Sequence, residues 1–454
     1  MRSFFSVFIV TLLLFSTLHA QQSDAALHRV MEQDKASRDS QGGPQKLSAA
    51  EHLGRAETYS ANRLFPQARE HWLKFIDNYP DDAGISKALF GIARSYMWER
   101  DYAKAVQWFN KLTKDHLFTK DGREGLAFKG ASLVRDGKNL EAAKAYEQYV
   151  KMFPTGEKIE SAYLNIIDAY REAGKYDEAN KWVNKTALTF TGKPSEVNAL
   201  HARLRMEIYG GNWISAIAAA DALMSVRSFA GSMTSSDEAK YLKAFALEKS
   251  NRNAEAESIY AAIPNSVNSY YGGLAAKRLA EVSRIKETRT AIYTDYPIPY
   301  RAVLIQHARS KKIDPRFMLA IMKQESVFKP GAKSPAGARG LLQLVYDTAL
   351  KYSKKAGYPN LQPDDLYDPS INIAIGSVYI GELKEEFGGL YEAIAASYNG
   401  GEDNTARWLN RSKPKEAGIF TSEIGFSETK NYVFKVMNNY RVYQQLYDEN
   451  LQKR

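Results

Sequence analysis

The 454-residue sequence contains no cysteine, so it can form neither a disulfide bond nor a cysteine-ligated metal site. Its seven histidines lack the spacing of metal ligands, and neither a phosphate-binding glycine-rich loop nor a nucleophile-elbow serine is present. No apolar run approaches the roughly 20 residues that a membrane-spanning helix needs. We therefore expect a chain without a cofactor, without a metal and without a membrane anchor.

Positive charge exceeds negative charge in this sequence, with 62 Lys and Arg against 52 Asp and Glu, a net charge of +10. Such an excess can favour an anionic partner. The basic residues are interspersed with acids and form no clustered stripe, so we expect no nucleic-acid partner. An ordinary solvated surface and long-range attraction to a carboxylate-rich polymer both remain open.

The N-terminal segment has the pattern of a signal peptide over residues 1–20, with Arg2, an apolar run from Phe4 to Leu14 and small or polar residues before Ala20. Export to the periplasm is the expectation, with secretion as the alternative. Residues 21–48 are polar and lack periodicity, and we expect a flexible lead-in there.

Residues 49–290 repeat a pair of helices at a nearly constant period. A large residue followed three positions later by alanine recurs 36 to 38 residues apart, in Phe65/Ala68, Tyr102/Ala105, Leu140/Ala143, Tyr176/Ala179 and Trp213/Ala216. The period is close to the roughly 34 residues of tetratricopeptide repeats. We expect a curved α-solenoid in which alanine lets paired helices approach and the larger residue packs between them. A sixth helix pair keeps the pattern of helices but loses the register of the repeated residues.

The last part of the chain, residues 291–454, is predicted to be a separate helical domain that begins near Pro297 and Pro299. Helices are expected at 303–312, after Asp314-Pro315, after Asp368-Pro369, at 390–399 and after Ser427. No alternating strand pattern occurs anywhere. The predicted fold class is therefore all-α.

Glu325 is the first candidate site residue, because it continues an apolar stripe. Met318, Ile321 and Met322 lie three and four residues apart on one helix face, and Glu325 is the next position on that face. Burial would raise the pKa of its carboxyl toward the range in which it can donate a proton near neutrality. Unless the side chain simply turns outward into water, this position indicates a general acid.

A loop of small residues, Ser334 to Gly340, follows this helix, and its backbone can approach a ligand closely. A second amphipathic helix is predicted over 341–357, with Gln343 in its first turn beside the loop.

Together these segments resemble the soluble lytic transglycosylase family, whose catalytic domain is a lysozyme-like α fold that cleaves peptidoglycan. The resemblance rests on Glu325-Ser326, on SPAGARGLLQ from Ser334 to Gln343 and on SYNGG from Ser397 to Gly401, in the family's order and spacing. NSYYGGLAAKRLAE also resembles the segment that joins the family's helical superhelix to its catalytic domain. The resemblance implies that peptidoglycan glycan strands are the partner and that the superhelix helps to form a cradle around the strand. A solenoid of this repeat type can also bind protein partners.

The resemblance further implies cleavage of the β-1,4 bond between N-acetylmuramic acid and N-acetylglucosamine without water, which leaves 1,6-anhydromuropeptides. Glu325 would act as acid and then as base. Ser334 and Gln343 would contact the substrate, while Tyr398 and Asn399 would flank the catalytic carboxyl. A core tyrosine and a surface glutamine are the plain structural alternatives for Tyr398 and Gln343.

The chain departs from the family pattern at a few positions. Leu342 replaces methionine, Tyr346 replaces proline and Ser397 replaces alanine. In the late motif, here SEIGFSET, Gly425 replaces proline and Glu423 lies one position nearer the isoleucine. We expect Glu423 to be a carboxylate of the substrate groove, provided that it takes the place of the family's glutamate in spite of this shift.

Two other functions fit the same sequence. A muramidase similar to goose-type lysozyme would use a second carboxylate, such as Asp347, Asp364 or Asp365, to activate water. A non-catalytic scaffold would bind a partner through the solenoid and hold glycan in the C-terminal domain.

Overall fold

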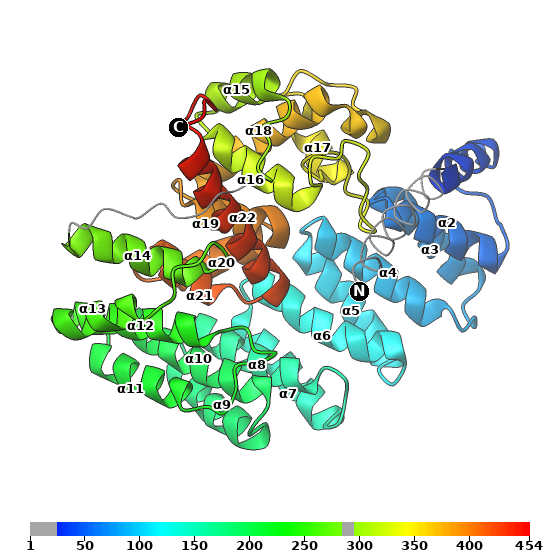
Figure 1. Cartoon of the computed structure of the whole chain (residues 1–454). Helices are drawn as coiled ribbons and strands as arrows, with labels where there is room; N and C mark the ends of the chain where they lie inside the picture. The colour runs from blue at the N-terminus through cyan, green and yellow to red at the C-terminus, as the bar shows by residue number, and fades with distance from the viewer. Residues whose placement is uncertain (1–24, 284–294) are drawn as a thin grey trace, which may run out of the picture. The chain divides into compact units, whose positions relative to one another are not determined.

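The computed structural model describes residues 25–283 and 295–454, where every regular element is helical and only isolated β-bridges occur besides (Figure 1). The all-α prediction is confirmed. The predicted signal peptide (1–20) and the predicted border at 290 and 291 lie outside the described residues. The chain forms two compact units, one of residues up to 136 with 299–311 and 325–379, the other of 137–298, 312–324 and 380–454.

The first unit begins with paired helices. They are α2 (Ala49–Ala61), α3 (Phe65–Asn78), α4 (Ile85–Trp98), α5 (Tyr102–Asp115) and α6 (Lys120–Arg135). Ser48 and Glu51 form a capping box that starts α2. Helices α3 and α4 approach closely, because a Cβ added to Gly91 would lie 2.5 Å from the Trp72 ring.

Residues 25–36 form a helix, so the prediction of a flexible lead-in over 21–48 was wrong for this part. Leu27 is buried in the same hydrophobic cluster as Trp72. Asp34 is buried and accepts hydrogen bonds from Tyr59 (3.1 Å) and Arg55 (3.3 Å). The contacts that order this segment come from residues distant in sequence, and its own polar composition gave no sign of them.

The rest of the first unit consists of α15 (Arg301–Ser310), α17 (Tyr346–Ser353), the 3₁₀-helix η1 (Pro363–Tyr367) and α18 (Pro369–Glu386) up to residue 379. Asp368 starts α18 by accepting hydrogen bonds from the backbone N–H groups of Ser370 and Ile371, at 2.8 and 3.0 Å. The predicted cap-plus-proline start is confirmed.

The second unit continues the helix pairs and ends in the C-terminal helices (Figure 1). Its paired helices are α7 (Asn139–Met152), α8 (Ile159–Glu172), α9 (Tyr176–Thr189), α10 (Pro194–Gly210), α11 (Trp213–Met224), α12 (Ser236–Lys249) and α13 (Asn253–Ala261), followed by α14 (Tyr270–Ser283). The remaining helices are α16 (Pro315–Glu325), α19 (Tyr391–Gly400), α20 (Glu402–Asn410), α21 (Ala417–Glu423) and α22 (Ser427–Leu446). Ile419 of α21 shares a hydrophobic cluster with Phe245 and Tyr271, so the solenoid and C-terminal helices of this unit have a common core.

The repeated residues only partly behave as predicted. All five repeated alanines are fully buried, which confirms their place at the helix contacts. Leu140 and Tyr176 are 46% and 39% exposed, so the expectation that the larger residue wedges between helices is wrong at these two positions. In the sixth pair Ala256 is buried three residues after the start of α13, so the alanine position persists where the sequence suggested that it was lost.

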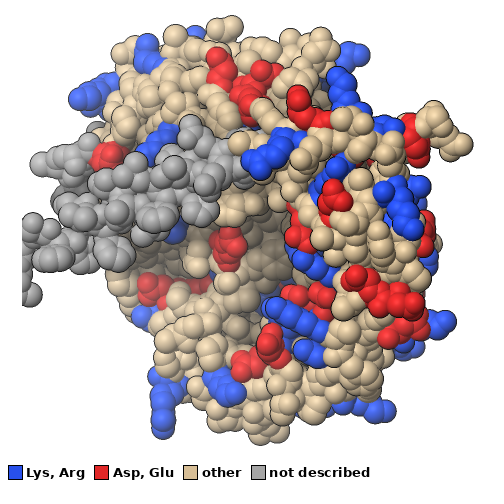
Figure 2. Space-filling model, turned by 90° about the vertical axis from the view of Figure 1, so that its right-hand side faces the viewer, with Lys and Arg blue, Asp and Glu red and all other residues tan. Residues whose placement is uncertain are grey.

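The surface in view in Figure 2 carries Lys and Arg interspersed with Asp and Glu, as the sequence suggested. In the described part of the chain, no helix has both the length and the apolar character to cross a membrane.

Candidate active site

Asp314 fixes the start of the helix that ends at Glu325. Its Oδ1 accepts a hydrogen bond from the backbone N–H two residues on (2.9 Å), and its Oδ2 accepts one from the Tyr440 hydroxyl (2.8 Å). Pro315 is the first helical residue, as predicted. The three apolar residues of the predicted stripe are fully buried.

Glu325 is the last residue of α16 and is half-buried. The chain reverses directly after it, because Val327 and Phe328 both have positive φ angles, +49° and +63°. Such conformations are costly for β-branched and bulky residues, and they concentrate at functional sites. Ser326 is buried, and its hydroxyl donates a hydrogen bond to the Leu341 carbonyl (2.7 Å), which ties the end of α16 to the following loop.

The loop after α16 is closed by its own hydrogen bonds. The Ser334 N–H donates to the Ala338 carbonyl (2.9 Å), and the Ser334 carbonyl accepts from the Gly337 N–H (3.0 Å). The Ser334 Oγ accepts from the Ala338 N–H at 3.1 Å. Gly340 has φ +79°, and a Cβ there would lie 2.1 Å from the Leu366 carbonyl oxygen. The small residues of the loop therefore allow close backbone approach, as predicted, here between segments of the protein itself.

Gln343 does not lie in a helix, contrary to prediction. Helix α17 begins at Tyr346, and Gln343 occupies a turn with φ +46°. Its Nε2 donates hydrogen bonds to the carbonyls of Ala332 (3.0 Å) and Gly340 (2.9 Å). The amphipathic pattern continues through the turn, but these side-chain bonds, together with paired backbone hydrogen bonds between Arg339 and Leu344 (2.9 and 3.0 Å), close a turn there in place of a helix.

The third motif ends α19 in the second unit. Ser397 is fully buried, Tyr398 is half-buried and Asn399 is exposed. The Asn399 Oδ1 accepts a hydrogen bond from the Thr429 hydroxyl at 2.7 Å. This contact fixes which end of the Asn399 amide faces Thr429 and leaves its NH₂ group directed elsewhere.

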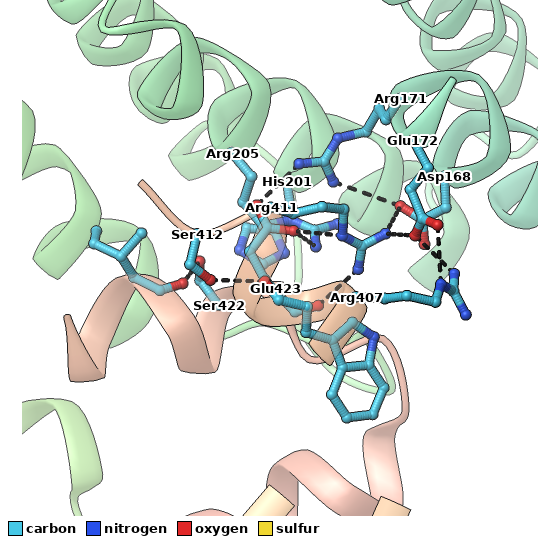
Figure 3. A network of polar contacts seen from close by, with 12 residues as sticks. Asp168, Arg171, Glu172, His201, Arg205, Arg407, Arg411, Ser412, Ser422 and Glu423 are labelled. Atoms are coloured by element: carbon cyan, nitrogen blue, oxygen red, sulfur yellow. Dashed lines mark hydrogen bonds and ion pairs between the residues drawn. The ribbon is translucent and has the colours of Figure 1, made fainter. Parts of the chain in front are cut away.

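Glu423 is 1% exposed and lies within a polar network (Figure 3). Its Oε1 accepts from Arg171 (2.9 Å) and its Oε2 accepts from Arg205 (3.0 Å). Burial alone would raise the pKa of Glu423, but Arg171, Arg205 and Arg411 lower it below the ordinary value. Both oxygens are occupied by protein, so this geometry lends no support to the substrate-groove role predicted for Glu423.

Two of the three carboxylates suggested for a hydrolase, Asp347 and Asp365, are engaged by other groups, and the third, Asp364, is exposed. Asp347 forms an ion pair with Arg63 (2.6 Å), and Asp364 lies 3.6 Å from His28. Asp365 accepts a hydrogen bond from the backbone N–H of residue 362 (2.7 Å) and so caps η1. Within the described residues, no group of three His, Cys, Asp or Glu side chains could hold a metal ion.

The family model of the transglycosylase SLT domain matches residues 302–420, and that of a tetratricopeptide repeat matches 53–116 and 129–189. The chain therefore carries tetratricopeptide repeats followed by an SLT domain. The resemblance drawn from Glu325 and the two later motifs is thereby confirmed.

Named relatives agree with this assignment. The soluble lytic murein transglycosylases of Salmonella typhimurium and Escherichia coli are each 35% identical to the chain over 144 residues, which is 31% of this chain and 22% of each relative. The membrane-bound lytic murein transglycosylase C of Yersinia pestis is 31% identical over 170 residues, 32% of this chain and 47% of that protein. The matched part thus spans about a fifth of the length of the soluble relatives.

A solved complex of the 70-kDa soluble lytic transglycosylase with bulgecin A aligns with 96% of this chain and 87% of that one, at 18% identity and a TM-score of 0.50. This likeness supports the fold, an α-solenoid with a lysozyme-like domain.

Within the SLT domain, two positioning residues were missed from the sequence. Asn372 is fully buried; its Oδ1 accepts from the Leu342 N–H (2.9 Å) and its Nδ2 donates to the carbonyls of Arg339 (3.0 Å) and Leu366 (2.8 Å). Arg339 is also fully buried and donates to the Gly337 carbonyl at 2.9 Å. A single amide inside the apolar run SINIAIG was the available signal for Asn372, since buried polar side chains are hydrogen-bonded.

Proposed function

We propose that this chain is a peptidoglycan lytic transglycosylase that cleaves the β-1,4 bond between N-acetylmuramic acid and N-acetylglucosamine and leaves 1,6-anhydro ends. The observation that carries the proposal is Glu325, half-buried at the end of a buried helix, inside a matched SLT domain that retains the two later motifs. Periplasmic export is proposed with it, on the signal-peptide pattern of residues 1–20.

Glycosidic cleavage needs a proton on the leaving oxygen and a group that captures the positive charge on the sugar. Glu325 donates the proton, and the oxygen of the muramoyl N-acetyl group attacks the anomeric carbon as the bond to the leaving oxygen breaks. The Glu325 carboxylate then accepts the proton of the 6-hydroxyl, whose oxygen bonds to the anomeric carbon and closes the 1,6-anhydro ring, while the bond from that carbon to the acetyl oxygen breaks and the N-acetyl group is restored. One carboxyl therefore suffices for both steps, and no water is consumed.

The loop geometry supports substrate contacts by Gln343 and Ser334. Both N–H bonds of the Gln343 amide are used within the loop, which leaves its Oε1 to accept a hydrogen bond from a substrate amide or hydroxyl. The Ser334 oxygen accepts from Ala338, which leaves its own proton to donate. Tyr398 and Asn399 are proposed to flank the catalytic carboxyl, by their place in the third motif.

The positions of the other carboxylates favour transglycosylation over hydrolysis. An inverting hydrolase needs a second carboxylate free to activate water. Asp347 is held by Arg63 and Asp365 caps a helix, while Asp364 is about half exposed to solvent. Binding of protein partners by the solenoid is proposed in addition, and it is compatible with this activity.

Two measurements on the full chain test the proposal. Mass spectrometry of digested sacculi should find muropeptides lighter by one water than hydrolysed ones, and products of hydrolysed mass would establish a muramidase instead. Glu325→Gln should still bind sacculi but should not dissolve them. Glu385→Gln, the same change at an exposed residue of α18, serves as the matched control and should clear turbidity normally. Undiminished clearing by Glu325→Gln would overturn the proposed role.

A further inference from the structure

A cavity of about 490 Å³ lies in the second unit, between α14, the start of α19 and α22 (Figure 1). The face that α22 turns toward it carries residues three and four positions apart, namely Met437, Tyr440, Arg441 and Gln444. Helix α14 approaches this face closely, because a Cβ added to Gly273 would lie 1.9 Å from the Arg441 Nη1. A cavity of about 150 Å³ can hold benzene, so this one has room for about 20 non-hydrogen atoms.

Glu392 lines the cavity with a buried carboxyl whose hydrogen bonds are incomplete. The residue is 6% exposed, and its Oε1 accepts a hydrogen bond from the Tyr270 hydroxyl at 3.2 Å. No other residue in the described part of the chain donates to its Oε2, and this oxygen is not fully enclosed, so a ligand in the cavity can reach it. Burial raises the pKa of Glu392, although Tyr270 and Lys277 oppose the shift. A buried acceptor without a donor is costly, and a ligand hydroxyl would satisfy it.

Three further polar side chains of the lining have no partner. Lys277, Asn438 and Gln444 form no hydrogen bond or ion pair within the residues that the structure describes. The amides of Asn438 and Gln444 each offer one acceptor and two donors. Lys277 is exposed and therefore lies on the open side of the cavity. The lining thus presents donors and acceptors at several points around a single ligand.

The charges of the lining select against charged ligands. Glu392 disfavours an anion, whereas Lys277 and Arg441 disfavour a cation. A purely apolar ligand would cover Glu392, Asn438 and Gln444 without bonding to them, which is costly. A neutral molecule with several hydroxyl or amide groups meets all of these conditions.

Aromatic rings complete the wall, and the protein holds them in place. The Tyr440 hydroxyl donates to the Asp314 Oδ2 at 2.8 Å, and the Tyr270 ring stacks on Phe434 with the ring centroids 4.7 Å apart. The Tyr391 ring lies 5.1 Å from that of Tyr440. Rings that are already fixed offer an apolar surface to the C–H groups of a sugar at little cost in entropy.

We propose that this cavity binds a neutral N-acetylated sugar, with Glu392 accepting hydrogen bonds from its hydroxyl groups. Such a sugar has about 15 non-hydrogen atoms, which the cavity can hold. Asn438 and Gln444 bind its remaining hydroxyls and its acetamide, and the tyrosine rings contact its C–H groups.

The natural ligand follows from the proposed function, on which this step rests. The glycan strands of peptidoglycan consist of N-acetylated sugars. Glu392 lies in the first turn of α19, and Tyr398 of the third motif lies about 9 Å further along the same helix. The cavity therefore holds a sugar of the strand away from the bond that is cut. This second contact raises the affinity for long strands.

Occupancy of the cavity can be followed on the full chain by NMR, because Met437 lines it. The ¹³C-labelled methyl signal of Met437, assigned by its loss in Met437→Leu, should shift saturably as N-acetylglucosamine is added. The signal of Met152, an exposed residue of α7 outside the lining, should not move. Glucosamine in its cationic form should bind at least about tenfold more weakly, because it meets Lys277 and Arg441 and lacks the acetyl group. Equal binding of the two sugars, or a Met437 signal that does not shift, would overturn the proposal.

Two substitutions in the lining test the contacts. Gln444→Leu removes a donor and an acceptor at similar size and should weaken binding of N-acetylglucosamine by about three- to tenfold. Gln445→Leu, the same change at the next residue of α22 outside the lining, is the matched control and should leave binding unchanged. Glu392→Gln keeps an oxygen for Tyr270 but replaces the second acceptor with an NH₂ group, and it should weaken binding at least as much as Gln444→Leu. Unchanged binding in either lining variant would contradict the proposed site.

A second assay separates this inference from the proposed activity. In a Glu325→Gln background, Gln444→Leu should bind peptide-free glycan strands more weakly than Gln445→Leu does. Equal binding by these two variants would overturn the assignment of the glycan strand as the natural ligand. Absence of cleavage by the unsubstituted chain would overturn the proposed function, while the Met437 signal would still decide whether the cavity binds a sugar.

Discussion

Arg63 and Asp347 form a bidentate ion pair, with Nε 2.6 Å from Oδ1 and Nη2 2.8 Å from Oδ2. Arg63 follows α2 of the solenoid, and its guanidinium lies 5.1 and 5.2 Å from the ring centroids of Phe65 and Trp98. Asp347 lies in the first turn of α17, four residues after Gln343. The first helix pair of the solenoid is therefore bonded to the segment that carries Gln343. The same ion pair occupies Asp347, one of the carboxylates suggested for a hydrolase.

Removing this pair should impair both stability and activity. Arg63→Met leaves the Asp347 carboxylate without its partner, and we expect a coupling energy of about 1 kcal/mol between Arg63→Met and Asp347→Asn in a double-mutant cycle of urea unfolding. The rate of sacculus clearing should fall in both single variants. Lys87→Met breaks an exposed ion pair with Glu57 and should cost less than about 0.5 kcal/mol. Strictly additive effects of Arg63→Met and Asp347→Asn would show that the pair does not act as one unit.

The two members of one repeated pair should differ in how strongly a substitution changes stability. Ala143 is fully buried, so Ala143→Leu overpacks the helix contact and should destabilise the protein by about 1–3 kcal/mol. Leu140 is 46% exposed, so Leu140→Ala should change stability by no more than about 0.5 kcal/mol. Thermal unfolding of the two variants compares them directly. If Leu140→Ala lowers stability by more than this, Leu140 packs between the helices as the sequence predicted.

Local patterns predicted the helices well, because the information that specifies them is local. The repeated alanines, the caps at Asp314 and Asp368 and the apolar stripe before Glu325 all depend on spacing within a few turns. The helix over 25–36 was missed for the opposite reason. Asp34 is fixed by Arg55 and His71, which lie outside this segment, so local spacing could not reveal these contacts.

The candidate site shows the same limit. Its motif residues could be found from the sequence, but their conformations could not. Gln343 adopts a left-handed turn in a loop that its amide helps to close by donating to the Ala332 and Gly340 carbonyls. Glu423 turns into the protein because Arg171, Arg205 and Arg411 surround it. The first outcome depends on how the loop closes, and the second depends on tertiary partners. Asn372, which holds the loop, stood out in sequence only as one amide in an apolar run.

A buried histidine pair should make the first unit sensitive to acid. The Nδ1 atoms of His52 and His71 are 3.1 Å apart, the Leu47 N–H donates to His52 Nε2 (3.2 Å), and His71 Nε2 lies 3.0 Å from Asp34 Oδ1. These contacts assign one proton to each ring: His52 Nδ1–H donates to His71, and His71 Nε2–H donates to Asp34. A further proton on either ring would set two donors against each other.

The direction of the pH effect follows from these groups. Burial lowers the pKa of His52 to about 4, with His71 and Arg55 adding to the effect, and burial also lowers the pKa of His71 although Asp34 opposes it. The unfolded chain takes up these protons near pH 6.5, so stability should fall as pH drops from about 6.5 to about 4, by about 3 kcal/mol for His52. The pKa of Asp34 is also lowered, against the effect of burial, chiefly by His71 and Arg38, so its contribution is lost only below this window.

Urea unfolding at several pH values between 7 and 4 measures the effect. His52→Gln should flatten the pH dependence of the unfolding midpoint, because one of the two titrating rings is gone. His116→Gln, a histidine outside this network, should leave the dependence unchanged. Equal slopes in His52→Gln and the unsubstituted protein would rule out the pair as its source.

Two substitutions at Gln343 separate its support of the loop from its contact with substrate. Gln343→Glu keeps the shape but sets a carboxylate oxygen against the carbonyls of Ala332 and Gly340, which now receive hydrogen bonds at 3.0 and 2.9 Å, and it should cost about 1–3 kcal/mol of stability. Gln343→Gly loses the same bonds but relieves the positive φ of +46°, so its stability should stay within about 1 kcal/mol of the original. If Oε1 binds substrate, Gln343→Gly loses cleavage although its stability is retained, because it alone removes that oxygen; Gln343→Glu keeps an acceptor there and loses only stability. Gln33→Glu, the same chemical change on an exposed helix position, should alter neither quantity. If Gln343→Gly cleaves nearly as fast as the unsubstituted protein, Gln343 only supports the loop and does not contact substrate.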